Sequence, residues 1–103
     1  MVPAFPKELP AADVNPAPLE TAAERSNYEK TSTYDEVMDF IFDAQKRSDK
    51  INILRFAAST EGRMIPLVII SSEGIKSPNE LKVTTKPTVL IMANIHAGEV
   101  EGK

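Results

Sequence analysis

The sequence predicts an α/β fold in which helices cover both sides of a sheet. Three observations support this class: apolar residues at helical spacing over 34–47, two β-branched or apolar runs on either side of Gly62, and a run over 89–95 of apolar residues and one neutral amide. An apolar run without alternation is typical of a strand buried on both faces, inside a sheet that helices cover on both sides. A chain of 103 residues with 42% hydrophobic content has room for one small domain with a single core.

Composition excludes several classes of function. The formal net charge is -3, and no window is rich in Lys and Arg, so we expect no nucleic-acid partner. The absence of cysteine excludes disulfides, thiolate metal sites and cysteine nucleophiles, and leaves the compartment open. No stretch approaches the roughly 20 apolar residues of a membrane span, and no signal peptide is visible. We therefore expect no membrane partner, and localisation stays undetermined.

The first 30 residues are predicted to form an extended, proline-rich arm. Five of the eight prolines fall within residues 1–18, among small and polar neighbours. Because proline removes a backbone donor and fixes φ, we expect neither a helix nor a sheet ladder there. A propeptide, or the remainder of an export signal, is the alternative for this segment. The domain is expected to span residues 31–103.

A helix is predicted over residues 34–47. Thr33 and Glu36 have the spacing of a capping box, acidic residues occupy the first turn, and Lys46 and Arg47 occupy the last. The predicted core-facing positions recur at intervals of three and four: Tyr34, Val37, Met38, Ile41, Phe42 and Ala44. The aromatic residues of this helix are therefore expected to belong to the core.

The next two runs, INILRFAAST and MIPLVIISS, predict a β-hairpin. Gly62, in the connecting TEGR, supplies the positive φ that a tight reversal requires. Pro66 has no amide donor, which places it on an edge or at a bulge. Glu61 and Arg63 are expected to be solvated turn residues.

A short helix is predicted near residues 78–83, followed by the buried strand. Ser77 stands at the N-cap position, Pro78 at the first helical position and Glu80 at the third. The stretch KPTVLIMANIH comes next, and Val89 to Ile95 form the predicted strand.

His96 and Glu99 stand at the carboxyl end of that strand, where ligands bind in open α/β sheets. Their i,i+3 spacing, with Gly98 between them, places an imidazole and a carboxylate on the same side of one turn. Such a pair supplies two of the three protein ligands of a catalytic zinc site. The third ligand must come from elsewhere, because the chain contains one histidine.

Three alternatives remain open from the residues. His96 can be a strand-end histidine bonded to a backbone carbonyl, with Glu99 favouring the next helix N-terminus. Residues 97–103 also fit the spacing of a phosphate-binding loop, although Glu99 and Glu101 oppose phosphate binding. The chain can also be a small, non-enzymatic interaction module.

The order of these features resembles the zinc carboxypeptidases of the carboxypeptidase A type. The resemblance covers about residues 31–103, through TSTYDEVMDFI, STEGRMIPLVIISS and KPTVLIMANIHAGEVEGK, and is strongest in the last stretch. It implies the beginning of a three-layer α/β/α sandwich with a mixed, mostly parallel sheet, of the zinc exopeptidase type and truncated here. It also implies that His96 and Glu99 are zinc ligands, with no catalytic residue inside this chain.

The implied activity is hydrolysis of a C-terminal peptide bond by zinc-activated water. The implied partner is a peptide or peptide-like substrate with a free C-terminus, and members of the family are often secreted or periplasmic. Digestive members have arginine where this chain has Gly98, so a peptidoglycan-type amidase or a deacylase of N-acyl amino acids stays open. We expect the 103 residues alone to be an inactive N-terminal part of a catalytic domain. Oligomeric state is not predicted.

Overall fold

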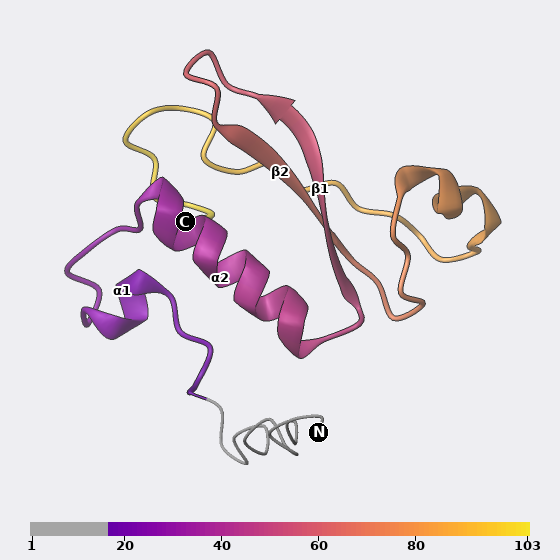
Figure 1. Ribbon diagram of the computed structural model, residues 1–103, viewed down its shortest axis with the longest axis horizontal. Coiled ribbons are helices and arrows are strands. Elements are labelled where there is room, and N and C mark those ends of the chain that lie inside the picture. Colours follow the sequence, from indigo (N-terminus) through magenta and orange to yellow (C-terminus); the bar gives the residue numbers. More distant parts are fainter. Residues whose placement is uncertain (1–16) are drawn as a thin grey trace, which may run out of the picture.

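The computed structural model describes residues 17–103 (Figure 1). Most of the predicted arm lies outside this range. Its described part is not wholly extended, because a one-turn helix, α1 (Ala22–Arg25), forms within it. The prediction of no helix was wrong there. Thr21 and Glu24 form a capping box that stabilises this turn, and the prediction considered only the prolines of the segment.

The predicted long helix is confirmed as α2 (Tyr34–Arg47). The Thr33 hydroxyl accepts the Glu36 N–H, and the Glu36 carboxylate accepts the Thr33 N–H at 2.8 Å. At the other end, Asp43 and Arg47 form an ion pair at 2.8 Å. Local sequence signals therefore fix both ends of this helix.

The hairpin is confirmed as β1 (Ile51–Ala58) and β2 (Met64–Ile70), which pair antiparallel. The Ser59 N–H donates to the Arg63 carbonyl at 2.8 Å across the turn, and Gly62 has φ +80°. Pro66 lies opposite Arg55, where the register shifts, in agreement with its predicted place at a bulge or edge.

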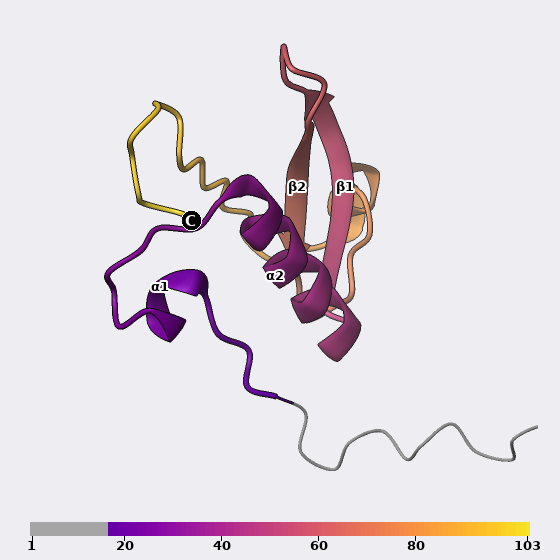
Figure 2. The same cartoon turned by 60° about the vertical axis from the view of Figure 1, so that its left-hand side comes forward.

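Helix α2 lies across one face of the hairpin (Figure 2). Met38 and Ala44 are buried in this contact layer, and the Tyr34 hydroxyl donates to the Met64 carbonyl at 2.8 Å. Two predicted core aromatics lie at its margin instead: Tyr34 is 37% exposed and Phe42 is 39% exposed. A two-stranded sheet is too narrow to cover the whole apolar stripe of the helix.

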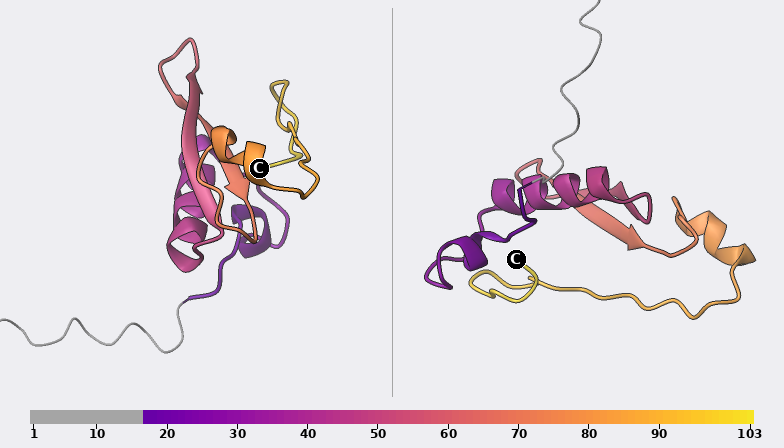
Figure 3. Two further views of the ribbon diagram at one scale, coloured as in Figure 1. Left: turned by 90° about the vertical axis from the view of Figure 1, so that its right-hand side faces the viewer. Right: turned by 90° about the horizontal axis from the view of Figure 1, so that it is seen from below.

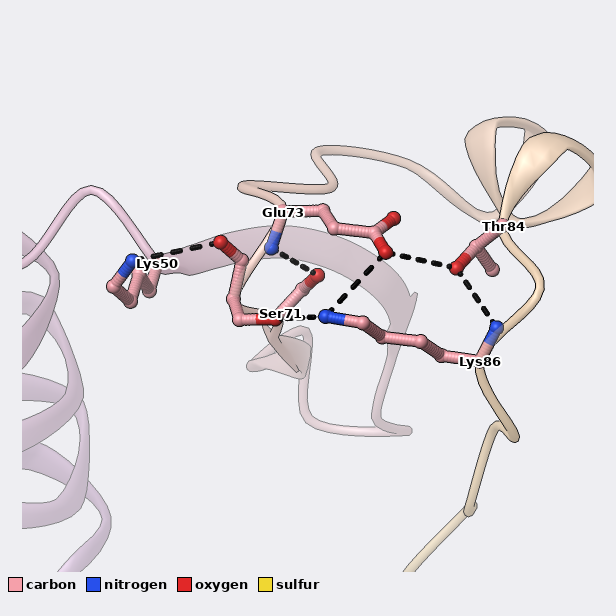
Figure 4. Close-up of polar contacts among 6 residues, drawn as sticks. Lys50, Ser71, Glu73, Thr84 and Lys86 are labelled. Atoms are coloured by element: carbon pink, nitrogen blue, oxygen red, sulfur yellow. Dashed lines mark hydrogen bonds and ion pairs between the residues drawn. The ribbon is translucent and has the colours of Figure 1, made fainter.

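A polar cluster closes the connection that follows β2 (Figure 4). Glu73 accepts the Thr84 hydroxyl at 3.3 Å and pairs with the Lys86 ammonium at 3.5 Å. The enclosed segment contains the predicted short helix, found as the 3-10 helix η1 (Pro78–Val83). Ser77 makes no side-chain cap there, and the Glu80 carboxylate instead accepts the Lys76 N–H.

The predicted buried strand over residues 89–95 is not formed, and this prediction is corrected. The segment has no regular secondary structure, and the exposed fractions of Val89, Ile91 and Met92 are 78%, 82% and 72%. Within the described residues the sheet has two strands, β1 and β2, and neither pairs with this segment. A strand needs a hydrogen-bonded neighbour, so an apolar composition alone leaves it extended and solvated.

The fold is therefore a small α/β arrangement with a two-stranded antiparallel sheet. Residues 84–95 run alongside the hairpin without pairing with it (Figure 3). An open groove of about 1400 Å³ lies between that segment, β2 and α2, and its lining includes Met38, Val68 and Ile91. None of the helices in residues 17–103 is long and apolar enough to cross a membrane.

Candidate metal centre

The candidate site is the turn that ends the apolar run. The Glu99 N–H donates to the His96 carbonyl at 3.2 Å, which closes one turn around Ala97 and Gly98. Gly98 has φ +87°, a conformation that residues with a Cβ rarely adopt. The sequence therefore needs glycine here for backbone geometry, and the turn forms without the predicted strand before it.

His96 and Glu99 converge as their spacing predicts. The His96 Nδ1 lies 2.7 Å from the Glu99 Oε1. The second carboxylate oxygen, Oε2, accepts the backbone N–H groups of Ile95 and His96 at 3.1 and 3.2 Å. One glutamate side chain thus contacts both the imidazole and the backbone that carries it.

These contacts lower the pKa of the Glu99 carboxyl below its ordinary value. The largest cause is the hydrogen bond with the His96 side chain, and the bonds from the backbone N–H groups act in the same direction. The carboxylate is therefore held in its charged form, which is the form that can ligate a cation.

Asn94 is a functional candidate that the sequence reasoning missed. Its side-chain amide donates to the Glu99 carbonyl at 2.7 Å, and its own φ is +55°. Treating residues 89–95 as a strand placed Asn94 on a regular pleat, where its side chain had no evident partner. Asparagine is enriched among non-glycine residues with positive φ, so its presence just before His96 could have indicated a turn at this position.

The pair is open to solvent. The His96 side chain is 78% exposed and the Glu99 side chain 38% exposed. A solvent-facing imidazole nitrogen and carboxylate suit a divalent cation such as zinc.

Within residues 17–103, no group of three or more potential ligand side chains gathers in one place. The described part of the chain therefore brings together two protein donors, one fewer than a catalytic zinc site contains. Both belong to the turn of residues 96–99.

The alternative of a phosphate-binding loop gains no support from this geometry. Such a loop directs free backbone N–H groups toward an anion. Here the Glu99 and Lys103 N–H groups bind the carbonyls of His96 and Val100, and the preceding strand is not formed. The alternative of a non-enzymatic interaction module has no observation in its favour either.

A small α/β unit followed by an exposed His-x-x-Glu turn defines a candidate metal-dependent hydrolase. The family model described as zinc carboxypeptidase matches residues 37–103, and the chain belongs to that family. The match covers α2 from Val37 onward, the hairpin, the η1 connection and the whole turn. Neither the curated proteins nor the solved structures compared with the chain include a match.

Proposed function

We propose that His96 and Glu99 are two ligands of the zinc ion in a carboxypeptidase-like hydrolase that cleaves a C-terminal peptide bond. The observation that carries the proposal is the 2.7 Å approach of His96 Nδ1 to Glu99 Oε1 in a turn that the zinc carboxypeptidase family covers. The proposed substrate is a peptide or peptide-like molecule with a free C-terminus.

The roles of the two residues follow from their contacts. His96 would bind in its neutral form through a ring nitrogen, and its ring already lies beside the Glu99 carboxylate. Glu99 would bind through an oxygen, while its backbone hydrogen bonds restrain the side chain. A zinc ion bound there would lower the pKa of its water to about 7 and polarise the scissile carbonyl.

We further propose that the 103 residues alone hold zinc weakly and do not turn over substrate. Support comes from the donor count: residues 17–103 bring two ligand side chains together rather than three. The exposed apolar segment at 89–95 also leaves the approach to the turn without packing support.

Zinc titration of the whole chain tests the ligand assignment. We expect Zn²⁺ alone to shift the NMR signals of His96 and Glu99, with affinity at least tenfold weaker in His96→Ala and several-fold weaker in Glu99→Gln. Glu101→Gln is the matched control, because Glu101 is an exposed carboxylate two residues further along. Zinc-induced shifts of the Glu99 signals that occur in His96→Ala at the same zinc concentrations as in the original chain would contradict the assignment.

Peptide hydrolysis with zinc present tests the proposed inactivity separately. Release of a C-terminal amino acid from a model peptide, monitored by chromatography, should be absent for the 103-residue chain. Turnover that depends on His96 would show that this chain completes the site, and would overturn the proposal of inactivity.

A further inference from the structure

Asn94 occupies an unusual backbone position immediately before the metal pair. Its φ of +55° lies in the left-handed region, which is unfavourable for most side chains and which asparagine tolerates better than most other residues. The chain therefore changes direction at Asn94, where the apolar run gives way to the turn.

The Asn94 side chain uses this position to hold the backbone of Glu99. Its Nδ2 donates to the Glu99 carbonyl at 2.7 Å, across a separation of five residues. In the opposite direction, the Glu99 Oε2 accepts the N–H groups of Ile95 and His96 at 3.1 and 3.2 Å. Asn94 and Glu99 thus close the turn from both ends, with His96 inside the closed loop.

Little else restrains the pair. His96 is 78% exposed on its side chain, and residues 89–98 are all exposed, so packing cannot fix the two donor atoms. Hydrogen bonds must therefore supply the order that a core would supply elsewhere. Partners that orient metal ligands in this way typically account for 10–100-fold in metal affinity.

We infer that Asn94 is a positioning residue for the metal pair: its amide, by binding the Glu99 carbonyl, holds the Glu99 carboxylate beside the His96 imidazole. This inference rests on the proposed function, because the pair is taken to be the zinc site. Asn94 itself does not touch the ion.

Two substitutions distinguish the contribution of the Asn94 side-chain amide from that of its backbone conformation. Asn94→Gly keeps the positive φ accessible and removes the amide, whereas Asn94→Ala removes the amide and also disfavours that φ. Asn79→Gly, at an exposed asparagine in η1, is the control for added backbone freedom. Each variant of the whole chain is titrated with Zn²⁺ and observed by NMR.

We expect zinc affinity to fall about tenfold in both Asn94 variants and to be unchanged in Asn79→Gly. Unfolding of α2 and the hairpin should be unaltered, since Asn94 lies outside that unit. Unchanged affinity in both Asn94 variants would overturn the inference. A loss in Asn94→Ala alone would also overturn it, because the backbone conformation rather than the amide would then be responsible.

A metal-free measurement separates this inference from the proposed function. Without zinc, cross-peaks between the His96 ring and the Glu99 side chain should be present in the original chain and weakened in Asn94→Gly. If the original chain shows no zinc response at His96, the proposed function fails while these cross-peaks still test the positioning role. Cross-peaks that are equally strong in Asn94→Gly would overturn the positioning role.

Discussion

The α2–hairpin unit and the segment of residues 84–103 are both rich in apolar residues, but they reach different structures. In the first, α2 lies against the hairpin, chiefly against β1, and Met38 and Ala44 are buried. In the second, seven successive residues from Val89 to Ile95 are exposed and form no strand. The difference shows that an apolar segment becomes buried only where a neighbouring element offers hydrogen-bond partners and an apolar surface.

The turn of residues 96–99, the candidate site, belongs to the second region, yet it keeps its shape. The contacts within it span three to five residues, from Asn94 to Glu99, and a single turn can make them without a packed core. The candidate site is therefore organised locally, while its surroundings are not.

The largest expected effect comes from matched truncations in the two regions. Met38→Ala should lower the free energy of unfolding by about 2 kcal/mol, at the low end for buried methionine because the core is thin. Met92→Ala, the same change at a side chain that is 72% exposed, should alter it by less than about 0.5 kcal/mol. Urea unfolding followed by circular dichroism measures both. Equal effects would mean that residue 92 is packed in solution.

A smaller loss is expected at the helix cap. Thr33→Ala removes the hydroxyl that accepts the Glu36 N–H, and should reduce the stability of the α2–hairpin unit by about 1 kcal/mol. Thr31→Ala, at an exposed residue before the cap, is the control. A helix content and midpoint unchanged in Thr33→Ala would show that packing alone fixes the start of α2.

Acid should weaken the same helix end. The backbone N–H of Thr33, and then its hydroxyl, lower the pKa of the Glu36 carboxyl in the folded state. A lowered folded-state pKa means that this contribution is present above the unfolded pKa of about 4.3 and is lost as pH falls through the folded value. Helix content measured from pH 6 to 2 should fall less steeply in Glu36→Gln. An identical pH profile of helix content in the original chain and Glu36→Gln would exclude Glu36 as the source of the acid sensitivity.

The smallest expected effect on stability is at Ile91, which is 82% exposed. Ile91→Lys should leave the unfolding of α2 and the hairpin unchanged. The same substitution should reduce self-association, because an uncharged apolar segment with unpaired backbone groups can pair with a second copy, and a lysine opposes this. Light scattering across a concentration series measures the association. Equal self-association of the original chain and Ile91→Lys would show that residues 89–95 do not cause it.

Local sequence predicted much of the fold correctly. The bounds of α2, its capping box, the reversal at Gly62 and the helical turn at residues 78–83 all depend on groups a few residues apart. The approach of His96 to Glu99 is of the same kind. The predicted strand at 89–95 failed because its assignment assumed neighbouring strands, and the assumption also concealed the role of Asn94.

The helix ends, the turns and the approach of the His96 imidazole to the Glu99 carboxylate follow from the sequence alone, because they depend on dihedral preferences and short-range hydrogen bonds. Which apolar residues are buried depends on tertiary contacts: Met38 is 9% exposed, Phe42 39% and Ile91 82%. Burial depends on the area that another element presents, and the residues of a segment cannot specify that area alone.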